Sequence, residues 1–335
     1  MQIDESYFKG EVRLGTYVPA TMKRCWAAQL EVYEDVRKLC DKYGIKYYAE
    51  WGTMLGAVRH GGFIPWDDDF DLGMLRSDYN LFLSVIDELP DHYKYMNIHN
   101  TPGYGEMLTR IVNSKDIRID DPFLEKYHNC PFAIGIDLFP SDYYPRDPEL
   151  ADLQKQLIHS IYSAAALWPT FDEEKKASTL NNILEVTQAD IDRSGDISMQ
   201  LYELAENICQ IADYDSADKV GIQILNVERD GYGIDKECYQ NTIEVPFEFT
   251  SVPVIAGYEK YLGLKYGDFM RVVKGGGGHD YPFYRHQRWN LDTYLEAHPE
   301  QCQTGLIRKY MEETEDEKKR GIYIADRLEN PESKF

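Results

Sequence analysis

The segment Gly52–Met74, GTMLGAVRHGGFIPWDDDFDLGM, constrains this chain most because it crowds acidic side chains into apolar, glycine-rich surroundings. Its four aspartates are Asp67, Asp68, Asp69 and Asp71. Carboxylates this close repel one another strongly unless a cation neutralises them. Because side chains alternate across a strand, a short strand here places Asp69 and Asp71 on one face, about 6–7 Å apart, and Phe70 on the other. Such a pair can share a hard cation, Mg²⁺ or Mn²⁺, whose usual partner is phosphate.

The overall charge limits which partners the chain can bind. Its 335 residues carry a formal net charge of -22, with 43% hydrophobic and 28% charged residues. This composition predicts one large or two modest globular domains rather than disorder. The acidity argues against non-specific binding to nucleic acid and against a polybasic membrane patch. A polyanionic substrate therefore needs locally placed lysines, arginines or metal.

The cysteines and the hydropathy pattern suggest a cytoplasmic protein. None of the six cysteines has CxxC spacing, so neither a zinc knuckle nor a thioredoxin-type site is indicated, and we expect them to be reduced and buried. The N-terminal segment lacks the apolar core of a signal peptide, and no window approaches 18 uninterrupted apolar residues. We therefore expect no transmembrane segment. Peripheral association with a membrane-bound acceptor remains compatible with this pattern.

Helical and strand patterns alternate in the first part of the chain. Apolar residues at three- and four-residue spacing predict a helix over 21–43, with Gly44 as its C-terminal cap. Helices are also predicted over 53–60, ended by Gly61 and Gly62, and from a cap at Ser77 to about residue 89. Strands are predicted within 45–52, 70–74, 93–100, 108–114 and 133–140, with a further candidate at 117–120.

The pattern changes after residue 145. Residues 148–212 are mainly helical, and residues 213–244 look rich in loops. A strand, a proline-marked entry and a helix from about Tyr258 to Leu264 follow, and the tail EETEDEKKR is a charged helix or a solvated end. We therefore divide the chain into a core at 1–145, a helical insertion at 146–245, and a C-terminal return to the core at 246–335.

The aspartate segment resembles the LicD family of phosphocholine transferases, which is related to the fukutin proteins. The family hallmark is GTLLGAxRHxGxIPWDDDxDxG, and residues 52–73 read GTMLGAVRHGGFIPWDDDFDLG. Three more segments agree in order: CDKYGIKYYAE, GIDLFP and VPVIAGYEKYLGLKYGDF. The resemblance implies the nucleotidyltransferase fold of the polymerase-beta superfamily. That is an α+β core with a mixed sheet flanked by helices, here with a helical insertion.

The resemblance also implies a set of site residues. Gly52 lets the backbone approach a phosphate, which Thr53 and the adjacent N–H groups at a helix N-terminus can hold. Asp69, Asp71 and Asp137 are the expected metal ligands and catalytic acids, and Asp137 is the preferred acceptor of the proton from the attacking hydroxyl. Pairing of Asp137 with an arginine such as Arg110 is the structural alternative.

Several neighbours of the cluster have two interpretations each. Asp67 is an even number of positions from Asp69 and Asp71, so in a strand it lies on their face and could assist metal binding. Asp68 lies on the opposite face and suits a turn or an ion pair. Arg59, with His60 beside it, could bind a phosphate or form a structural salt bridge to the aspartates. Trp66 is expected to be a core or site-wall aromatic.

The segment KGGGGHDYPFYRH lacks the GxxxxGK[ST] order, which excludes a Walker loop. It is either an ordinary flexible loop or a lid that brings Lys274, Arg285 or His286 to the donor. Its glycine run departs from the family pattern, so the choice between His279 and His286 stays open. Three aromatics, Tyr281, Tyr284 and Trp289, could form a cage for a quaternary ammonium, with ordinary packing as the alternative.

The resemblance implies an enzyme that moves phosphocholine from CDP-choline to a hydroxyl of a cell-surface glycan or its precursor and releases CMP. Donors built on CDP-ribitol, CDP-glycerol or CDP-ethanolamine, or an NTP, fit the same fold. An inactive metal-binding scaffold in a glycan-assembly complex is the alternative of another class.

Overall fold

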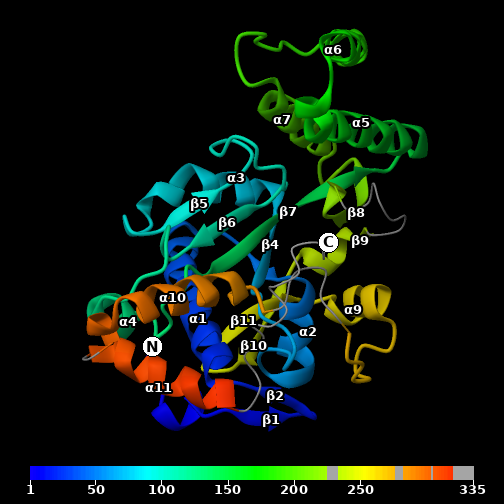
Figure 1. Cartoon of the computed structure of the whole chain (residues 1–335). Helices are drawn as coiled ribbons and strands as arrows, with labels where there is room; N and C mark the ends of the chain where they lie inside the picture. Colours follow the sequence, from blue (N-terminus) through cyan, green and yellow to red (C-terminus); the bar gives the residue numbers. More distant parts are fainter. Residues whose placement is uncertain (225–232, 276–281, 303–304, 320–335) are drawn as a thin grey trace.

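The computed structural model of the chain describes residues 1–224, 233–275, 282–302 and 305–319 (Figure 1). The helices are α1 (Ala20–Tyr43), α2 (Trp51–His60), α3 (Arg76–Val85), α4 (Asp121–Lys126), α5 (Pro148–Leu167), α6 (Glu173–Thr187), α7 (Ile197–Cys209), α9 (Tyr258–Tyr266), α10 (Arg285–Ala297) and α11 (Gly305–Lys319). The strands are β1 (Glu11–Arg13), β2 (Thr16–Val18), β3 (Tyr48–Ala49), β4 (Asp71–Leu75), β5 (Lys94–Met96), β6 (Thr109–Val112), β7 (Gly135–Pro145), β8 (Ala217–Gly221), β9 (Ile234–Asp235), β10 (Thr242–Phe247) and β11 (Thr250–Ile255). Short 3-10 turns occupy Glu5–Phe8, Ile86–Glu88, Trp168–Thr170, Lys236–Tyr239 and Pro299–Cys302.

A mixed sheet forms the centre of the molecule, with strand order β3-β4-β7-β6-β5. Only the pair β4 and β7 is parallel within this path, and β8 extends the sheet by pairing with the second half of β7. Helix α1 packs against β7, and its buried Trp26 and Tyr33 enter the main core. Tyr33 contacts Phe70 with ring centroids 5.1 Å apart, so this core lies directly under the acidic segment.

The architecture confirms the α+β class and several local predictions. Helix α1 ends at Gly44, whose φ of 66° is the left-handed conformation that a glycine cap adopts at little cost. Gly61 ends α2 in the same way. The cysteines are all free thiols, and Cys25, Cys40, Cys130 and Cys209 are buried, whereas Cys238 and Cys302 are partly exposed.

Other local predictions are wrong. Residues 117–120 form no strand, and Ser77 lies inside α3 because Leu75 takes the cap position without a side-chain bond. Helix α3 ends at Val85 and is followed by a 3-10 turn rather than continuing to residue 89. Within 213–244, β8 and β9 replace part of the expected loop.

The single strand expected before the helix at Tyr258 is a hairpin, because the chain reverses between β10 and β11. Its turn residue Glu248 adopts a φ of 48° without being a glycine. Contacts from distant parts of the chain hold it there: its N–H donates to the Gly61 carbonyl at 2.8 Å, and its carboxylate accepts from Arg13 at 2.9 Å.

Helices α5, α6 and α7 stand at one end of the sheet and have a hydrophobic cluster of their own (Figure 1). The cluster also takes in Ile98 and Met107 from the core segment. No helix among the described residues is both long and apolar enough to cross a bilayer. The proposed boundaries near residues 145 and 245 stay a prediction.

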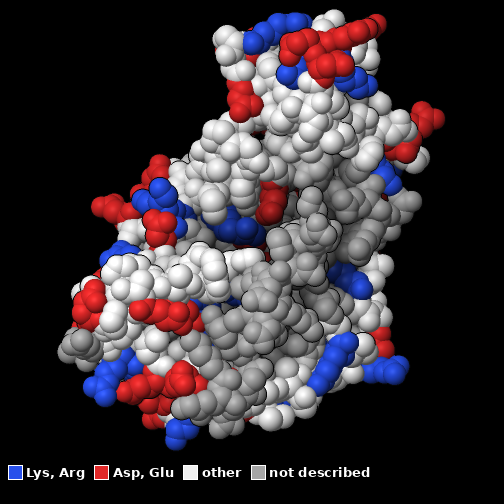
Figure 2. All heavy atoms as spheres, in the orientation of Figure 1, with Lys and Arg blue, Asp and Glu red and all other residues white. Residues whose placement is uncertain are grey.

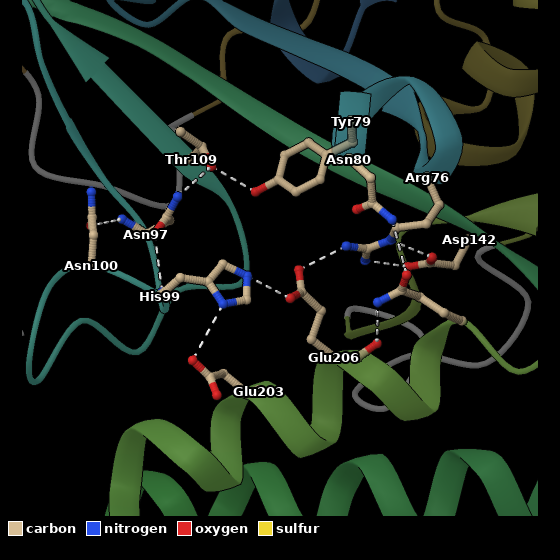
Figure 3. Close-up of polar contacts among 11 residues, drawn as sticks. Arg76, Tyr79, Asn80, Asn97, His99, Asn100, Thr109, Asp142, Glu203 and Glu206 are labelled. Carbon is tan, nitrogen blue, oxygen red and sulfur yellow. Dashed lines mark hydrogen bonds and ion pairs between the residues drawn. The ribbon is translucent and has the colours of Figure 1, made fainter. Parts of the chain in front are cut away.

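A charged network joins this helical part to the sheet (Figure 3). Arg76 at the start of α3 donates to both carboxylate oxygens of Asp142 on β7, at 2.7 and 2.8 Å, and to Glu206 on α7 at 2.7 Å. His99 contacts the second oxygen of Glu206 at 2.8 Å, and this contact raises the pKa of His99. Because Asp142 and Glu206 are buried, these pairs fix α7 against the sheet.

Candidate active site

The loop that carries the aspartates is held from below by α1. Trp26 donates its indole N–H to the carbonyl of Asp67 at 3.0 Å, and Gln29 donates to the carbonyl of Asp68 at 2.9 Å. The side chain of Asp68 is fully buried and accepts the backbone N–H of Phe283 at 2.6 Å. Asp68 therefore ties the acidic loop to the segment that leads into α10, which agrees with a structural role for this residue.

Asp71 and Asp137 are brought together by strand pairing. They are register partners on the parallel strands β4 and β7, so their side chains share one face of the sheet, on strands about 4.8 Å apart. Asp71 is buried, and burial raises its pKa well above the usual value; the charges of Asp69, Asp137 and Asp67 raise it further. The structure thus places Asp69, Asp137 and Asp67 close enough to Asp71 for their charges to raise its pKa.

Asp137 forms the ion pair with Arg110 that we gave as the structural alternative to metal binding. Arg110, its register partner on β6, donates to both carboxylate oxygens at 2.8 and 2.7 Å, and this pairing raises the pKa of Arg110. Among the described residues, no three carboxylate, imidazole or thiol groups already have an arrangement that could hold a metal ion. The metal role of Asp69, Asp71 and Asp137 therefore stays a prediction.

The chemistry of these side chains nevertheless fits a hard divalent cation. Asp69, Asp71 and Asp137 supply only carboxylate oxygens, which Mg²⁺ prefers, and a cation would relieve the repulsion that raises the pKa of Asp71. For Asp137 to take part, Arg110 has to release at least one of its oxygens.

The first turn of α2 lies beside these acids. Thr53 is buried, and its hydroxyl accepts the backbone N–H of Asp71 at 2.8 Å, so it positions the start of β4. A Cβ at Gly52 would stand 2.5 Å from a carboxylate oxygen of Asp67. Position 52 therefore needs a glycine, because an anionic group comes very close to its backbone. In the structure that group is the carboxylate of Asp67. Phosphate binding by Gly52 and Thr53 stays a prediction.

Arg59 forms no salt bridge to the aspartates among the described residues, and phosphate binding by Arg59 and His60 stays a prediction. Arg59 donates to the carbonyls of Phe269 and Arg271, at 2.9 and 3.2 Å, and through Nε to His60 at 2.9 Å. Burial and the neighbouring guanidinium lower the pKa of His60 to about 4, so its imidazole is neutral and accepts this bond. In this conformation Arg59 holds the segment after α9 against α2.

The remaining candidates lie around the rim. Lys274 is exposed, with its ammonium 5.8 Å from the centroid of the Trp66 ring, and His286 is exposed in the first turn of α10. Trp66 itself packs partly buried against the core. Lys274 and His286 therefore lie at the surface, and their contact with a donor stays a prediction. His279 lies outside the described residues.

Two of the three aromatics considered for a cage lie among the described residues. Tyr284 is buried and stacked on Phe132, with centroids 5.2 Å apart and planes at 5°, so it has the packing role given as the alternative. Trp289 is 48% exposed on α10, and Tyr281 lies outside the described residues.

A buried ion pair behind the first turn of α2 was missed from the sequence. Glu50 caps α2 and is 1% exposed; its Oε1 lies 3.6 Å from the ammonium of Lys265 on α9. Lys265 also lies 3.3 Å above the ring of Trp51, whose φ of 47° is unusual for a non-glycine residue. Burial lowers the pKa of Lys265 to about 8 and raises that of Glu50. The one available signal was the position of Glu50 just before the Gly52–Thr53 turn.

Comparison with known proteins agrees with this geometry. Residues 44–147 match the family model described as LicD/FKTN/FKRP, nucleotidyltransferase domain. The lipopolysaccharide cholinephosphotransferase LicD of Haemophilus influenzae is 25% identical over 258 residues, which cover 72% of this chain and 89% of that protein. Residues 44–147 of this chain are therefore similar to the nucleotidyltransferase domain of the LicD family. The matched segment contains α2, β4, β6 and β7, and with them Asp71, Arg110 and Asp137.

Other matches are shorter. An uncharacterized protein of Rickettsia typhi is 43% identical over 132 residues, 39% of each chain. The human ribitol 5-phosphate transferase FKRP is 43% identical over 54 residues, which are 16% of this chain and 11% of FKRP. The LicD family therefore includes relatives named for two different phospho-substituents.

Proposed function

We propose that this LicD-family phosphotransferase moves phosphocholine from CDP-choline to a hydroxyl of a cell-surface glycan or its precursor, with release of CMP. The observation that carries the proposal is the register pair Asp71 and Asp137 beside the N-terminus of α2. An electrostatic site of this kind suits a reaction in which charge develops on phosphoryl oxygens. The name of the Haemophilus influenzae relative supports choline as the substituent.

The reaction forms one bond and breaks one. The acceptor oxygen attacks the phosphorus that bears choline, the bond from that phosphorus to the oxygen bridging it to CMP breaks, and CMP leaves with the bond's electron pair. A divalent cation bound by Asp69, Asp71 and Asp137 would neutralise the diphosphate and stabilise the leaving group. The chain positions these acids through the Thr53 bond to β4 and through the loop contacts from α1.

The hydroxyl proton needs an acceptor, and Asp137 remains our preferred base. Its two oxygens are held by Arg110 in the structure, so proton transfer to Asp137 requires Arg110 to move away from at least one of them. The same guanidinium, once released, is a suitable bidentate partner for a phosphate of the donor.

Isothermal titration with CDP-choline and magnesium, followed by turnover assays, tests the proposal. We expect magnesium-dependent binding and CMP release by the wild-type enzyme, and loss of turnover in Asp69→Ala and Asp71→Ala. Absence of binding to the wild type, or unchanged turnover in both variants, contradicts it.

Another CDP-activated donor is the second candidate, and the match to ribitol 5-phosphate transferase favours CDP-ribitol among these. A donor panel with CDP-choline, CDP-ribitol, CDP-glycerol, CDP-ethanolamine and an NTP separates the options, because an NTP releases pyrophosphate instead of CMP. Hydrolysis of any CDP donor with magnesium eliminates an inactive scaffold. A cytoplasmic location, with peripheral access to a membrane-bound acceptor, is part of the same proposal.

A further inference from the structure

A pocket of about 650 Å³ opens between α10 and the segment that follows β6. Its size is in the range of sites that hold small organic ligands. One wall consists of α10 side chains, and the other comes from residues 115–119 and from Ala133, which precedes β7. The polar and aromatic lining includes Lys115, Asp116, Asn290 and Tyr294.

The wall formed by α10 is firmly anchored. Gln287 accepts the N–H of Ala133 at 2.8 Å and donates to its carbonyl at 2.9 Å, which clamps α10 to the entry of β7. On the buried side, Arg288 donates to Glu317 of α11 at 2.8 Å, and Glu317 in turn accepts from Thr21 at 2.9 Å. These contacts make the pocket a preformed feature, which reduces the entropy lost when a ligand binds.

The pocket lies next to the acids. Ala133 in its wall precedes Asp137 by four residues, which is at most about 13 Å along an extended chain. On the other wall, Gln287 follows Phe283 by four residues, and Phe283 donates its N–H to Asp68. Figure 2 shows a hollow above α10 with acidic and basic atoms inside it. The separation of the pocket wall from Asp137 along the chain is therefore within the length of an oligosaccharide of a few sugar units.

The lining is better suited to a neutral polar ligand than to the donor. Lys115 and Asp116 are both exposed and have opposite charges, so their contributions nearly cancel, whereas a diphosphate requires net positive charge. Asn290 is exposed and offers both a donor and an acceptor, and Tyr294 is 44% exposed, stacks on His298 through one ring face and offers the other. Ile117, Ile119 and Leu291 add apolar surface. Hydroxyl groups and C–H faces of sugars match this mixture.

We propose that this pocket is an acceptor subsite, which binds sugar units adjacent to the one that receives the substituted phosphate. The inference rests on the proposed transfer to a glycan. The enzyme should then prefer an oligosaccharide acceptor over the corresponding monosaccharide, because only the oligosaccharide fills the pocket.

The test compares Asn290→Ala and Tyr294→Ala with the wild type in the full-length enzyme. The probes are a core oligosaccharide prepared from lipopolysaccharide and the monosaccharide that carries its acceptor hydroxyl, with CDP-choline and magnesium. Each variant removes one contact, so we expect the ratio of kcat/KM for the two acceptors to fall roughly threefold to tenfold, through the KM of the oligosaccharide. Glu296→Ala, an exposed substitution on α10 away from the pocket lining, is the matched control and should keep the wild-type ratio.

An unchanged ratio in both variants, or a rise in the KM of CDP-choline instead of the oligosaccharide, overturns the inference. Either result leaves the proposed function standing, provided that the wild type hydrolyses CDP-choline with magnesium in the absence of acceptor. Absence of that hydrolysis with every CDP donor refutes the proposed function and this inference with it.

Discussion

Removal of the ammonium at Lys265 should destabilise the protein strongly, because it leaves the carboxylate of Glu50 buried without a counter-charge. The two groups are 3.6 Å apart, and their side chains are 6% and 1% exposed. At this distance and an effective dielectric constant of about 20, the attraction is about 4–5 kcal/mol. The Oε2 atom of Glu50 has no hydrogen-bond partner among the described residues, and Oε1 accepts only a long 3.4 Å bond from the Trp51 N–H, which compensates little for the loss. We therefore expect Lys265→Met to lower the free energy of unfolding by about 3–5 kcal/mol.

A double-mutant cycle with urea unfolding monitored by circular dichroism measures this effect. Glu50→Gln combined with Lys265→Met should be more stable than Lys265→Met alone, because the second substitution removes the buried charge. Lys260→Met is the matched control: Lys260 lies on the same helix and pairs with Asp235, but both side chains are about half exposed, so its loss should cost under about 1 kcal/mol.

The pH dependence of Lys265→Met gives an independent check. Burial raises the pKa of Glu50 above its value in the unfolded chain, so the folded variant binds a proton more readily. Its stability should therefore be greatest in acid and fall as the pH rises through the folded pKa of Glu50. A cost under about 1 kcal/mol at pH 7, or a double variant in which the two single costs simply add, would refute the reasoning.

Four further predictions concern the acid cluster and its surroundings. Asp71→Asn should raise the melting temperature of the metal-free protein, because it removes a buried charge from among other carboxylates, while it abolishes transfer; an unchanged or lower melting temperature would contradict this. Gly52→Ala should reduce transfer at least tenfold, since its Cβ would lie 2.5 Å from a carboxylate oxygen of Asp67. The melting temperature should change little, because alanine favours the helix by about 1 kcal/mol relative to glycine and this gain offsets the steric cost. His60 has a folded pKa of about 4, so the unfolded chain binds its proton first and the wild type should lose stability as the pH falls from 6.5 towards 4; thermal melts of His60→Gln should show a weaker loss. Arg110→Met should strengthen magnesium binding measured by calorimetry without substrate, because it frees both oxygens of Asp137, and weaker binding would show that Arg110 supports the metal site.

The sequence allowed prediction of those elements whose determinants are local. The apolar spacing of α1 and its Gly44 cap, the Gly61 end of α2, and the acids at the starts of β4 and β7 all depend on residues within a few positions of one another. The family pattern then placed Asp71 and Asp137 in one site, and strand register puts their side chains on one face.

What the sequence did not reveal depends on contacts between distant residues. The hairpin turn at Glu248 carries no glycine or asparagine signal, because Arg13 and the carbonyl of Gly61 hold its left-handed backbone. The partner of Glu50 lies 215 positions away in α9, where Lys265 is one of several charged residues with no distinguishing pattern. Strand β8 was assigned to loop because its stability comes from pairing with β7.

The contact between Arg110 and Asp137 shows why the acids alone do not determine the chemistry of the site. A carboxylate held by two charge-assisted hydrogen bonds is neutralised without metal, so the same three acids can exist as a structural ion pair or as ligands of a cation. Asp71 behaves differently from Asp137. When Arg110 pairs with Asp137, Asp71 stays buried among other acids, and its pKa stays raised. Asp71 is therefore a buried carboxyl whose ionisation the neighbouring acids disfavour and a bound cation would favour. For that reason we expect Asp71, rather than Asp137, to make the larger contribution to cation affinity.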